Sequence, residues 1–290
     1  MSAEIIDGRA IAAEVRAELR EHVKLLEKKN VTPGLAVVLV GDDPASRVYV
    51  RMKNKACSEL GIHNRTIELP SSTSETELLD LVRELGTENT FHGILVQLPL
   101  PAGIDTMKIL EAVNIAKDVD GFHPANVGRL VLGEKVLKPC TPAGIQELLR
   151  RKGISTSGKH VVIVGRSNIV GKPLANMLSL KSEMADATVT LCHSRTNSVE
   201  KYTRQADILI AAMGRPEVIS GEMIKKGAVV IDVGVNRVED PGSEKGYRLA
   251  GDVHFDSAAR VASAITPVPG GVGPMTIAML LYNTVRAAQG

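Results

Sequence analysis

Aromatic residues are scarce in this 290-residue sequence, which has no tryptophan, three phenylalanines and four tyrosines. Proteins that bind single-stranded nucleic acids usually stack the bases on aromatic side chains beside a basic groove. The formal net charge of +2 is too small to indicate a polyanionic partner. We therefore expect no nucleic-acid partner.

Cysteine is also rare. The three cysteines, Cys57, Cys140 and Cys192, are widely separated, odd in number and outside any CxxC pair. This pattern argues against a disulfide framework and against a zinc site, and it fits a reducing compartment. We expect buried or semi-buried thiols and no bound metal.

Long apolar runs are missing as well, since no segment approaches the ~18 residues that a membrane span needs. The first ten residues lack the apolar core that follows a basic start in a secretory signal. The acidic residues Glu4 and Asp7 are not typical of an organellar transit peptide. The sequence therefore predicts a cytoplasmic protein that does not bind membranes.

The sequence does contain a regular alternation of apolar strands and amphipathic helices. Residues 8–29 carry an apolar stripe at spacings of three and four, which predicts a helix. Residues 34–40 (GLAVVLV) predict a buried strand, and the helix after it begins behind Asp43 and ends before Gly61. The other predicted elements are strands at 62–69, 93–97, 160–164, 187–191, 207–211 and 228–233, and helices at 74–85, 105–113, 141–151, 171–180 and 273–290.

This order predicts an α/β protein whose parallel strands are covered by helices on both faces. We expect two α/β domains with a cleft between them, the second a Rossmann-like parallel sheet. The first would span 1–140 and the second 141–270, with the C-terminal helix at 271–290 packing back on the first. Residues 114–138 break the alternation, and long irregular stretches are usually functional or linking.

A glycine-rich turn follows the predicted strand at 160–164 and runs from Gly165 to Gly171. Such a turn lets the backbone approach a pyrophosphate, while free N–H groups and the positive end of the next helix face the anion. The pattern departs from GxGxxG, because Ser167 holds the second glycine position and Gly171 falls one residue late. An ordinary strand-to-helix turn is the alternative.

The end of the next predicted strand indicates which nucleotide would bind. An acidic residue about 20 positions on binds the ribose of NAD, whereas an arginine accommodates the extra phosphate of NADP. Here Arg195 follows the strand without a carboxylate, and a guanidinium can bind phosphate bidentately. The sequence therefore predicts NADP, with a solvated surface charge at Arg195 as the alternative. The expected cofactor-binding residues are Gly165, Arg166, Ser167, Ile169, Val170, Gly171, His193, Ser194, Arg195 and Thr196.

A tyrosine and a lysine share one face of the predicted helix after residue 43. Tyr49 and Lys53 lie four residues apart, so their side chains are neighbours. A phenol can hold an ammonium group in place, and desolvation would make the amine usable as a general acid or base. A semi-exposed helix face without a function is the alternative.

Three further stretches offer ligand contacts. Gln97 follows a predicted strand, where α/β sheets place their ligands, and its amide both donates and accepts. Asp120 lies in KDVDGF at 117–122, and its carboxylate can accept a pair of donors from an amino-heterocycle. In PVPGGVGPMT at 267–276, glycines allow close approach to a flat ligand and prolines stiffen the loop.

Together these motifs resemble the methylenetetrahydrofolate dehydrogenase/cyclohydrolase family of the FolD type. They span nearly the whole chain in the family's order; PGGVGPMT and VQLPLP are specific, whereas the glycine turn alone is not. The matching stretches are Tyr49-x-x-x-Lys53, VQLPLP at 96–101, KDVDGF at 117–122, KPCTP at 138–142, GRSNIVGKP at 165–173 and PVPGGVGPMT at 267–276.

The resemblance implies oxidation of 5,10-methylenetetrahydrofolate by NADP, followed by hydrolysis of the 5,10-methenyl product to 10-formyltetrahydrofolate. It also implies that Lys53 is the acid/base residue of the hydrolysis, that Tyr49 and Gln97 position and tune it, and that Asp120 anchors the pterin. A homodimer joined through the nucleotide-binding domains is implied too. The implied substrate-binding residues are Tyr49, Val96, Gln97, Leu98, Asp120, Pro269, Gly270 and Gly271.

Two other functions stay open from the residues alone. One is an NADP dehydrogenase for an amino acid or a hydroxy acid, because a fold does not fix a function. The other is a non-enzymatic NADP-binding regulator. The choice of substrate separates the first from a folate enzyme, and turnover by the purified protein excludes the second.

Overall fold

The computed structural model describes residues 2–243 and 246–290, which form two compact units. We call residues 13–140 and 277–290 the small-sheet unit, and residues 2–12 and 141–276 the large-sheet unit. The sequence pattern assigned residues 2–12 to the first domain. They group with the large-sheet unit because the strand that they contain pairs with a strand of that unit.

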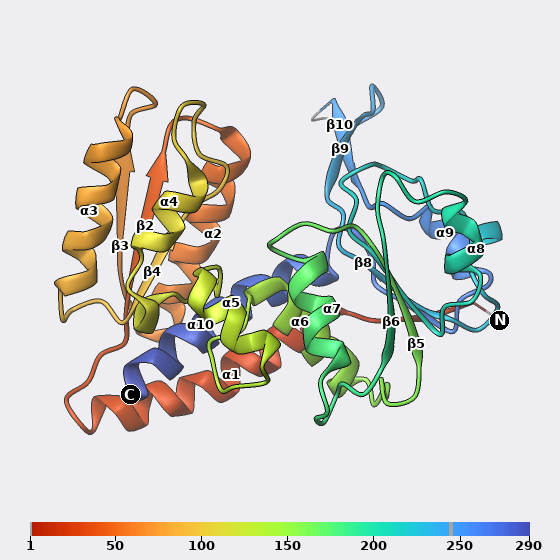
Figure 1. Cartoon of the computed structure of the whole chain (residues 1–290), viewed down its shortest axis with the longest axis horizontal. Helices are drawn as coiled ribbons and strands as arrows, with labels where there is room; N and C mark the ends of the chain where they lie inside the picture. Colours follow the sequence, from red (N-terminus) through yellow and green to blue (C-terminus); the bar gives the residue numbers. More distant parts are fainter. Residues whose placement is uncertain (1, 244–245) are drawn as a thin grey trace. The chain divides into compact units, whose positions relative to one another are not determined.

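The small-sheet unit is built on a parallel sheet in the order β3-β2-β4. Figure 1 shows α3 and α2 on opposite sides of this sheet. The elements of the unit are β2 (Gly34–Val40), α2 (Pro44–Leu60), β3 (His63–Leu69), α3 (Glu75–Thr87), β4 (Gly93–Val96), α4 (Thr106–Ala112), the 3-10 helix η1 (Ile115–Lys117) and α5 (Pro124–Val131), with most of α1 (Gly8–Glu27) and α10 (Val272–Gln289).

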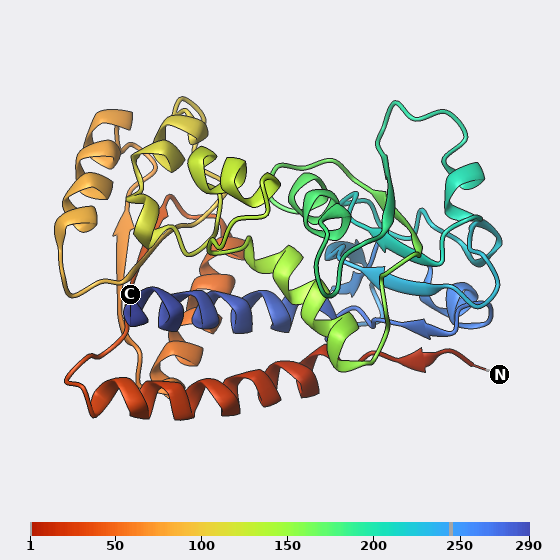
Figure 2. The same ribbon diagram turned by 60° about the horizontal axis from the view of Figure 1, so that its bottom comes forward.

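The central strand β2 is buried along its whole length, which explains its unbroken apolar run. Ala36, Val38 and Val40 point to one face, where they pack against Leu78 of α3 and Ile109 of α4. Helix α2 contacts β2 and β3. Beyond the sheet, α10 from residue 277 and α1 from residue 13 run side by side (Figure 2).

Helix α2 begins and ends where the sequence predicts. The Asp43 carboxylate accepts a hydrogen bond from the Ser46 backbone N–H, and Pro44 occupies the first turn. Gly61 ends the helix in the left-handed conformation, at φ +75°. Because its two ends are fixed in this way, the Tyr49–Lys53 face has a defined position.

The irregular stretch at 114–138 contains a helix that the sequence pattern did not reveal. Helix α5 is short, and the side chain of His123 caps it by accepting from the Ala125 N–H at 3.1 Å. Pro124 occupies its first turn. The glycine at 128 lies inside the helix and weakened its signal in the sequence.

The large-sheet unit contains a parallel sheet in the order β1-β11-β8-β7-β5-β6. Its elements are β1 (Glu4–Ile5), α6 (Cys140–Arg151, from residue 141), β5 (His160–Val164), α7 (Gly171–Ser179), β6 (Thr188–Cys192), α8 (Val199–Thr203), β7 (Ile208–Ala211), the 3-10 helix η2 (Gly221–Met223), β8 (Val229–Asp232), β9 (Asn236–Glu239), β10 (Tyr247–Ala250), α9 (Phe255–Ala259) and β11 (Ala264–Ile265).

The chain moves from β5 to β6 on one side and then crosses to β7 on the other side of β5. Such a reversal is a topological switch point, where open α/β sheets bind ligands beyond the carboxyl ends of their strands. The expected Rossmann-like parallel sheet is therefore confirmed. The two-residue strands β1 and β11 and the antiparallel pair β9–β10 were not predicted from the sequence.

Among the helices of the described residues, none is long and apolar enough to cross a membrane.

The capping box at the start of α3 gives a test of the fold. The Ser74 Oγ accepts from the Glu77 N–H at 3.2 Å, and the Glu77 carboxylate accepts from the Ser74 N–H at 2.8 Å. Ser74→Ala should lower the free energy of unfolding by about 1 kcal/mol, measured by urea denaturation. The matched control is Ser72→Ala, two residues earlier on exposed chain. Equal effects of the two substitutions would contradict the assigned role of the cap.

Candidate active site and cofactor site

A buried lysine lies near the end of the small sheet where its strands have their carboxyl ends. Lys53 of α2 is only 8% exposed. Its Nζ donates a hydrogen bond of 3.0 Å to Oε1 of Gln97. The Gln97 Nε2 donates in turn to the Leu98 carbonyl at 2.7 Å, which fixes the amide with its oxygen toward the lysine.

Parallel strand pairing brings these two residues together. Gln97 directly follows β4, and its backbone N–H donates to the Val38 carbonyl of the neighbouring strand β2. Lys53 lies on the helix that follows β2. Both residues therefore lie beyond the carboxyl ends of the strands, although they are 44 positions apart in the sequence.

Tyr49 lies on the same helix, one turn before Lys53, and is partly buried. In the part of the chain that the structure describes, its hydroxyl forms no hydrogen bond to Lys53, whose partner is Gln97. The hydrogen bond that holds the ammonium group comes from the half-buried Gln97 amide.

The Asp120 carboxyl group faces the same lysine. Burial raises the pKa of Asp120, the charge of Lys53 lowers it, and the charge of Asp118 raises it further. Its interaction with the Cys140 side chain lowers that pKa. Lys53 therefore has a hydrogen bond with Gln97 and a charge interaction with Asp120; we refer to these three residues as the Lys53 cluster.

The other aspartate of KDVDGF has a different environment. The Asp118 carboxylate accepts from the backbone N–H groups of Phe122, at 3.1 Å, and His123, at 2.9 Å. It also accepts from Nδ2 of Asn126 at 2.9 Å. With these three donors Asp118 shapes the loop, which leaves Asp120 as the carboxyl group beside Lys53.

Two residues that the sequence analysis did not assign to the site hold this loop in place. Asn283 of α10, which is buried, donates to the carbonyl oxygens of Val119 and Lys138, both at 2.8 Å. The Cys140 thiol donates to the Val119 carbonyl at 3.2 Å. The only sequence signal was one polar residue inside an otherwise apolar helical face.

All three cysteines are buried, as expected, and no disulfide links them. Burial raises the pKa of Cys57 to about 12, against a smaller lowering by the nearby Lys53. Burial and the charge of Asp120 raise the pKa of Cys140 well above its ordinary value. Both thiols are therefore neutral near pH 7 and are poor nucleophiles.

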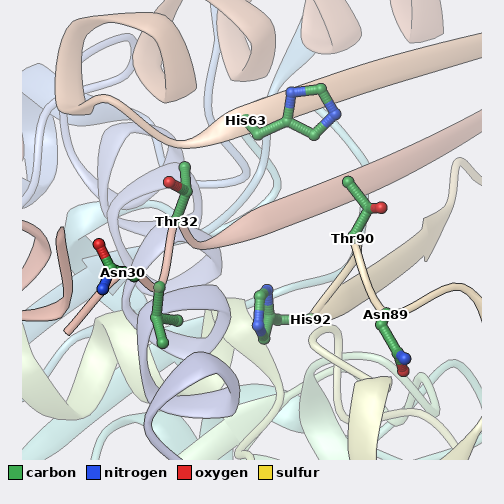
Figure 3. Close-up of a pocket in the computed structure, with 7 residues that line it drawn as sticks. Asn30, Thr32, His63, Asn89, Thr90 and His92 are labelled. Atoms are coloured by element: carbon green, nitrogen blue, oxygen red, sulfur yellow. The ribbon is translucent and has the colours of Figure 1, made fainter.

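A pocket of about 430 Å³ lies at the opposite end of the small sheet, where its strands begin (Figure 3). Its walls come from the residues before β2 and β4 and from the start of β3. His92 contributes to the strand edge there, since its Nδ1 accepts from the Gly34 N–H at 3.1 Å. The pocket does not include Lys53, Gln97 or Asp120.

In the large-sheet unit, the glycine-rich turn is built on close backbone contacts. A Cβ on Gly165, whose φ is +135°, would lie 2.0 Å from the Ala212 carbonyl oxygen. A Cβ on Gly171 would lie 1.9 Å from the Gly165 carbonyl oxygen. Only glycine fits at either position. The second glycine therefore serves the turn although it lies one residue later than in GxGxxG.

The residues between the two glycines form a turn that leads into α7. The Ser167 Oγ accepts from the N–H groups of Val170, at 3.1 Å, and Gly171, at 3.4 Å. Val170 is buried, whereas Ile169 and Arg166 are exposed. This arrangement leaves Arg166 and the turn open to a ligand at the positive end of the helix.

The loop after β6 forms a compact turn. The Thr196 Oγ1 accepts from the His193 N–H at 2.9 Å, and the His193 Nδ1 accepts from the Arg195 N–H at 3.1 Å. Ser194 and Arg195 are exposed at its tip. Within residues 2–243 and 246–290, the guanidinium groups of Arg166 and Arg195 form no ion pair, so both are available to an anion.

The glycine pair at 270–271 belongs to the large-sheet unit, whereas Lys53, Gln97 and Asp120 belong to the small-sheet unit. Gly270 has φ +117°. A Cβ on Gly271 would lie 2.7 Å from the Pro267 carbonyl oxygen, and one on Gly8 would lie 1.8 Å from the Gly271 carbonyl oxygen. Tight packing of the backbone thus requires glycine at 271.

Comparison with known proteins identifies the family. The profile of the tetrahydrofolate dehydrogenase/cyclohydrolase catalytic domain matches residues 6–120, and that of the family's NAD(P)-binding domain matches residues 139–290. The bifunctional protein FolD of Moorella thermoacetica is 60% identical over 289 residues, which cover 100% of both chains.

Solved structures agree with the sequence comparison. The bifunctional FolD enzyme of Campylobacter jejuni superposes with a TM-score of 0.94 at 47% identity and covers 99% of both chains. The Trypanosoma brucei FolD, solved with NADP and an inhibitor, has a TM-score of 0.94 at 43% identity and covers 100% of this chain and 98% of its own. The chain belongs to the tetrahydrofolate dehydrogenase/cyclohydrolase family.

Proposed function

We propose that this protein oxidises 5,10-methylenetetrahydrofolate to 5,10-methenyltetrahydrofolate with NADP and then hydrolyses the product to 10-formyltetrahydrofolate. The observation that carries the assignment of residues is the hydrogen bond of buried Lys53 to Gln97, together with the charge interaction of Lys53 with Asp120, in a chain of this family. An NADP dehydrogenase for a hydroxy acid or an amino acid would not need this cluster in the folate-type domain.

Hydrolysis of the methenyl group requires proton transfers in both directions. Water adds its lone pair to the electrophilic methenyl carbon and loses one proton. The resulting hydroxyl loses its second proton as the C=O bond forms, the bond from that carbon to one nitrogen breaks, and that nitrogen gains a proton. Lys53 is the group in the cluster that can carry a proton in both directions. Its low exposure supports this role, because an amine shielded from bulk water exchanges protons with its bound ligand.

Gln97 and Tyr49 act on the lysine in different ways. Gln97 holds the ammonium through Oε1 and is itself held through the Leu98 carbonyl, so the Nζ has a fixed direction. Tyr49 lies one turn earlier on the same helix, and its hydroxyl group has no hydrogen-bond partner among the described residues. We assign Tyr49 to substrate contact and orientation of Lys53.

Asp120 is assigned to the pterin ring. Burial raises the pKa of its carboxyl group, and the charge of the neighbouring lysine opposes that rise. An ionised carboxylate can accept two N–H donors from an amino-heterocycle. Val96, Leu98, Pro269, Gly270 and Gly271 complete the proposed substrate-binding set, because backbone at the ends of strands and at glycines allows a flat ligand to approach closely.

The glycine-rich turn fits NADP. Its backbone packs without Cβ atoms at Gly165 and Gly171, so a pyrophosphate can approach the turn closely. Exposed Arg166 and Arg195 offer two guanidinium groups to the extra phosphate. The remaining proposed contacts are Ser167, Ile169, Val170, His193, Ser194 and Thr196. NADP, when bound, accepts a hydride from the methylene group of the substrate.

A homodimer is part of this proposal. The large sheet ends at β6, whose outer edge has unpaired backbone groups that an identical strand could meet. Sedimentation equilibrium of the purified protein should give about twice the chain mass of 30.9 kDa. A single species at the chain mass would contradict the dimer and leave the catalytic proposal unaffected.

Removal of the lysine amine should separate the two activities. Lys53→Met keeps the length of the side chain, but it should lower the rate of methenyltetrahydrofolate hydrolysis at least about 100-fold, because proton transfer is lost. The dehydrogenase rate should fall much less. The assay follows the loss of methenyl absorbance, with Lys55→Met as the control on the exposed side of the same helix. A normal hydrolysis rate in Lys53→Met would exclude the assigned role.

Cofactor preference tests the arginines and the reaction together. With 5,10-methylenetetrahydrofolate, the protein should reduce NADP faster than NAD. Arg195→Ala and Arg166→Ala should each raise the KM for NADP about 10- to 100-fold and leave the KM for NAD nearly unchanged, since charge-assisted hydrogen bonds contribute about 1.5–3 kcal/mol. The readout is the absorbance of the reduced nicotinamide.

The matched control is Arg260→Ala, which removes an exposed arginine that precedes the amino end of β11. Equal losses for NADP and NAD in the Arg195 variant would overturn the phosphate assignment. No reduction of either cofactor by the parent protein would restrict the function to the hydrolytic reaction or to a regulator.

A further inference from the structure

A buried carboxylate holds the loop that follows β7. Asp252 is fully buried. Its Oδ2 accepts from the backbone N–H groups of Met213, at 2.5 Å, and Gly214, at 3.0 Å. Its Oδ1 accepts from the Arg215 N–H at 2.9 Å. Three consecutive backbone donors of one loop therefore point at a single side chain.

Other contacts fix Asp252 itself. Asn236 donates from Nδ2 to the Asp252 Oδ1 at 2.9 Å, and the Asp252 backbone N–H donates to the buried Asp232 carboxylate at 2.9 Å. The Asp252 carbonyl accepts from the Ile219 N–H at 3.0 Å, farther along the same loop. The carboxylate is therefore a rigid anchor for this loop.

A glycine lies against each of the two carboxylates, those of Asp232 and Asp252. A Cβ on Gly234 would lie 2.1 Å from the Asp252 Oδ1, and one on Gly251 would lie 1.8 Å from the Asp232 Oδ2. Burial and the charge of Asp252 raise the pKa of Asp232 to about 7, while its backbone N–H donors lower it. The two side chains thus occupy a specifically built site.

The anchored loop lies at the switch point of the sheet. It follows β7, the neighbour of β5, and the Ala212 N–H donates to the Val164 carbonyl at 2.8 Å. The Ala212 carbonyl oxygen fills the space where Gly165 would carry a Cβ. In the same way, the Gly165 carbonyl oxygen occupies the position that a Cβ on Gly171 would take. A shift of the loop would therefore displace the glycine-rich turn, since no side chain separates these segments.

We propose that Asp252 is a positioning residue for the dehydrogenase reaction, which sets the affinity for the dinucleotide by holding the 212–215 loop against the glycine-rich turn. This inference rests on the proposed placement of NADP at that turn. Gly214 lies at the tip of the loop with φ +67° and open space beyond it. The loop can therefore border a ligand without blocking it.

Asp252→Asn tests the proposal with little change of shape. The amide places an NH2 group against at least one backbone N–H donor, so the loop should lose its anchor. The KM for NADP should rise about tenfold, the effect of losing one hydrogen bond to a charged group. The KM for NAD should rise by the same factor, because the loop is not assigned to the extra phosphate. The kcat at saturating NADP should change much less.

The second activity of the protein reports on folding. Hydrolysis of methenyltetrahydrofolate needs no NADP, so Asp252→Asn should hydrolyse it at the parent rate. The matched control is Asp207→Asn, at the amino end of β7, where the carboxylate accepts from the His160 backbone N–H at 2.9 Å. It should leave the KM for NADP unchanged.

Two results would overturn the inference: an unchanged KM for NADP, or a parallel loss of both activities with a lowered unfolding temperature. If Asp252→Asn does not fold, Asn236→Ala removes one donor and keeps the carboxylate. It should raise the KM for both cofactors about twofold to fivefold, and no change would also overturn the inference.

The Arg195 and Asp252 variants should change the KM values for NADP and NAD in different ways. Failure of the phosphate assignment would leave the NADP preference intact in Arg195→Ala, while Asp252→Asn still weakened both cofactors. Failure of the Asp252 inference would leave its KM values unchanged, while Arg195→Ala still lost NADP selectively.

Discussion

Parallel strand pairing is the constraint on which both sites depend. In a parallel sheet every strand ends at the same edge, so residues far apart in the sequence leave the sheet together. Lys53 reaches Gln97 because β2 and β4 are adjacent and in register, with Val38 beside Val96. In the large sheet, the same geometry brings the loop after β7 against the turn after β5.

The two sites handle buried charge in opposite ways. Near Lys53, burial raises the pKa of the Asp120 carboxyl group, and the charge of the lysine opposes that rise. Asp252 is surrounded instead by N–H donors, which stabilise a carboxylate without a mobile proton. A proton can move within the first arrangement, whereas the second is a fixed electrostatic anchor. This contrast fits catalysis at Lys53 and positioning at Asp252.

The elements with long periodic patterns were predictable from the sequence. The buried run of β2, the caps of α2 and the glycines of the nucleotide turn each depend on interactions within a few residues. The strands β1 and β11 were missed because two residues carry no pattern. The role of Asp252 was hidden because its partners are backbone groups 37 to 39 positions away, and backbone groups leave no mark in a sequence. The Lys53–Gln97 contact was likewise visible only as two separate residues.

In the proposed cofactor site, different groups determine the choice between NADP and NAD and the affinity for either one, because these groups act at different places. Arg195 and Arg166 are exposed side chains at loop tips, so they can distinguish one phosphate without altering the turn. The Ser167 side chain holds the end of the turn, but at Gly165 the turn meets the Ala212 backbone directly. The position of that neighbouring backbone is set by a group behind it. A buried carboxylate suits that position, because its two oxygens can accept several N–H donors at once. Substitutions at the arginines should therefore change which dinucleotide binds, whereas those at Asp252 change how tightly either one binds.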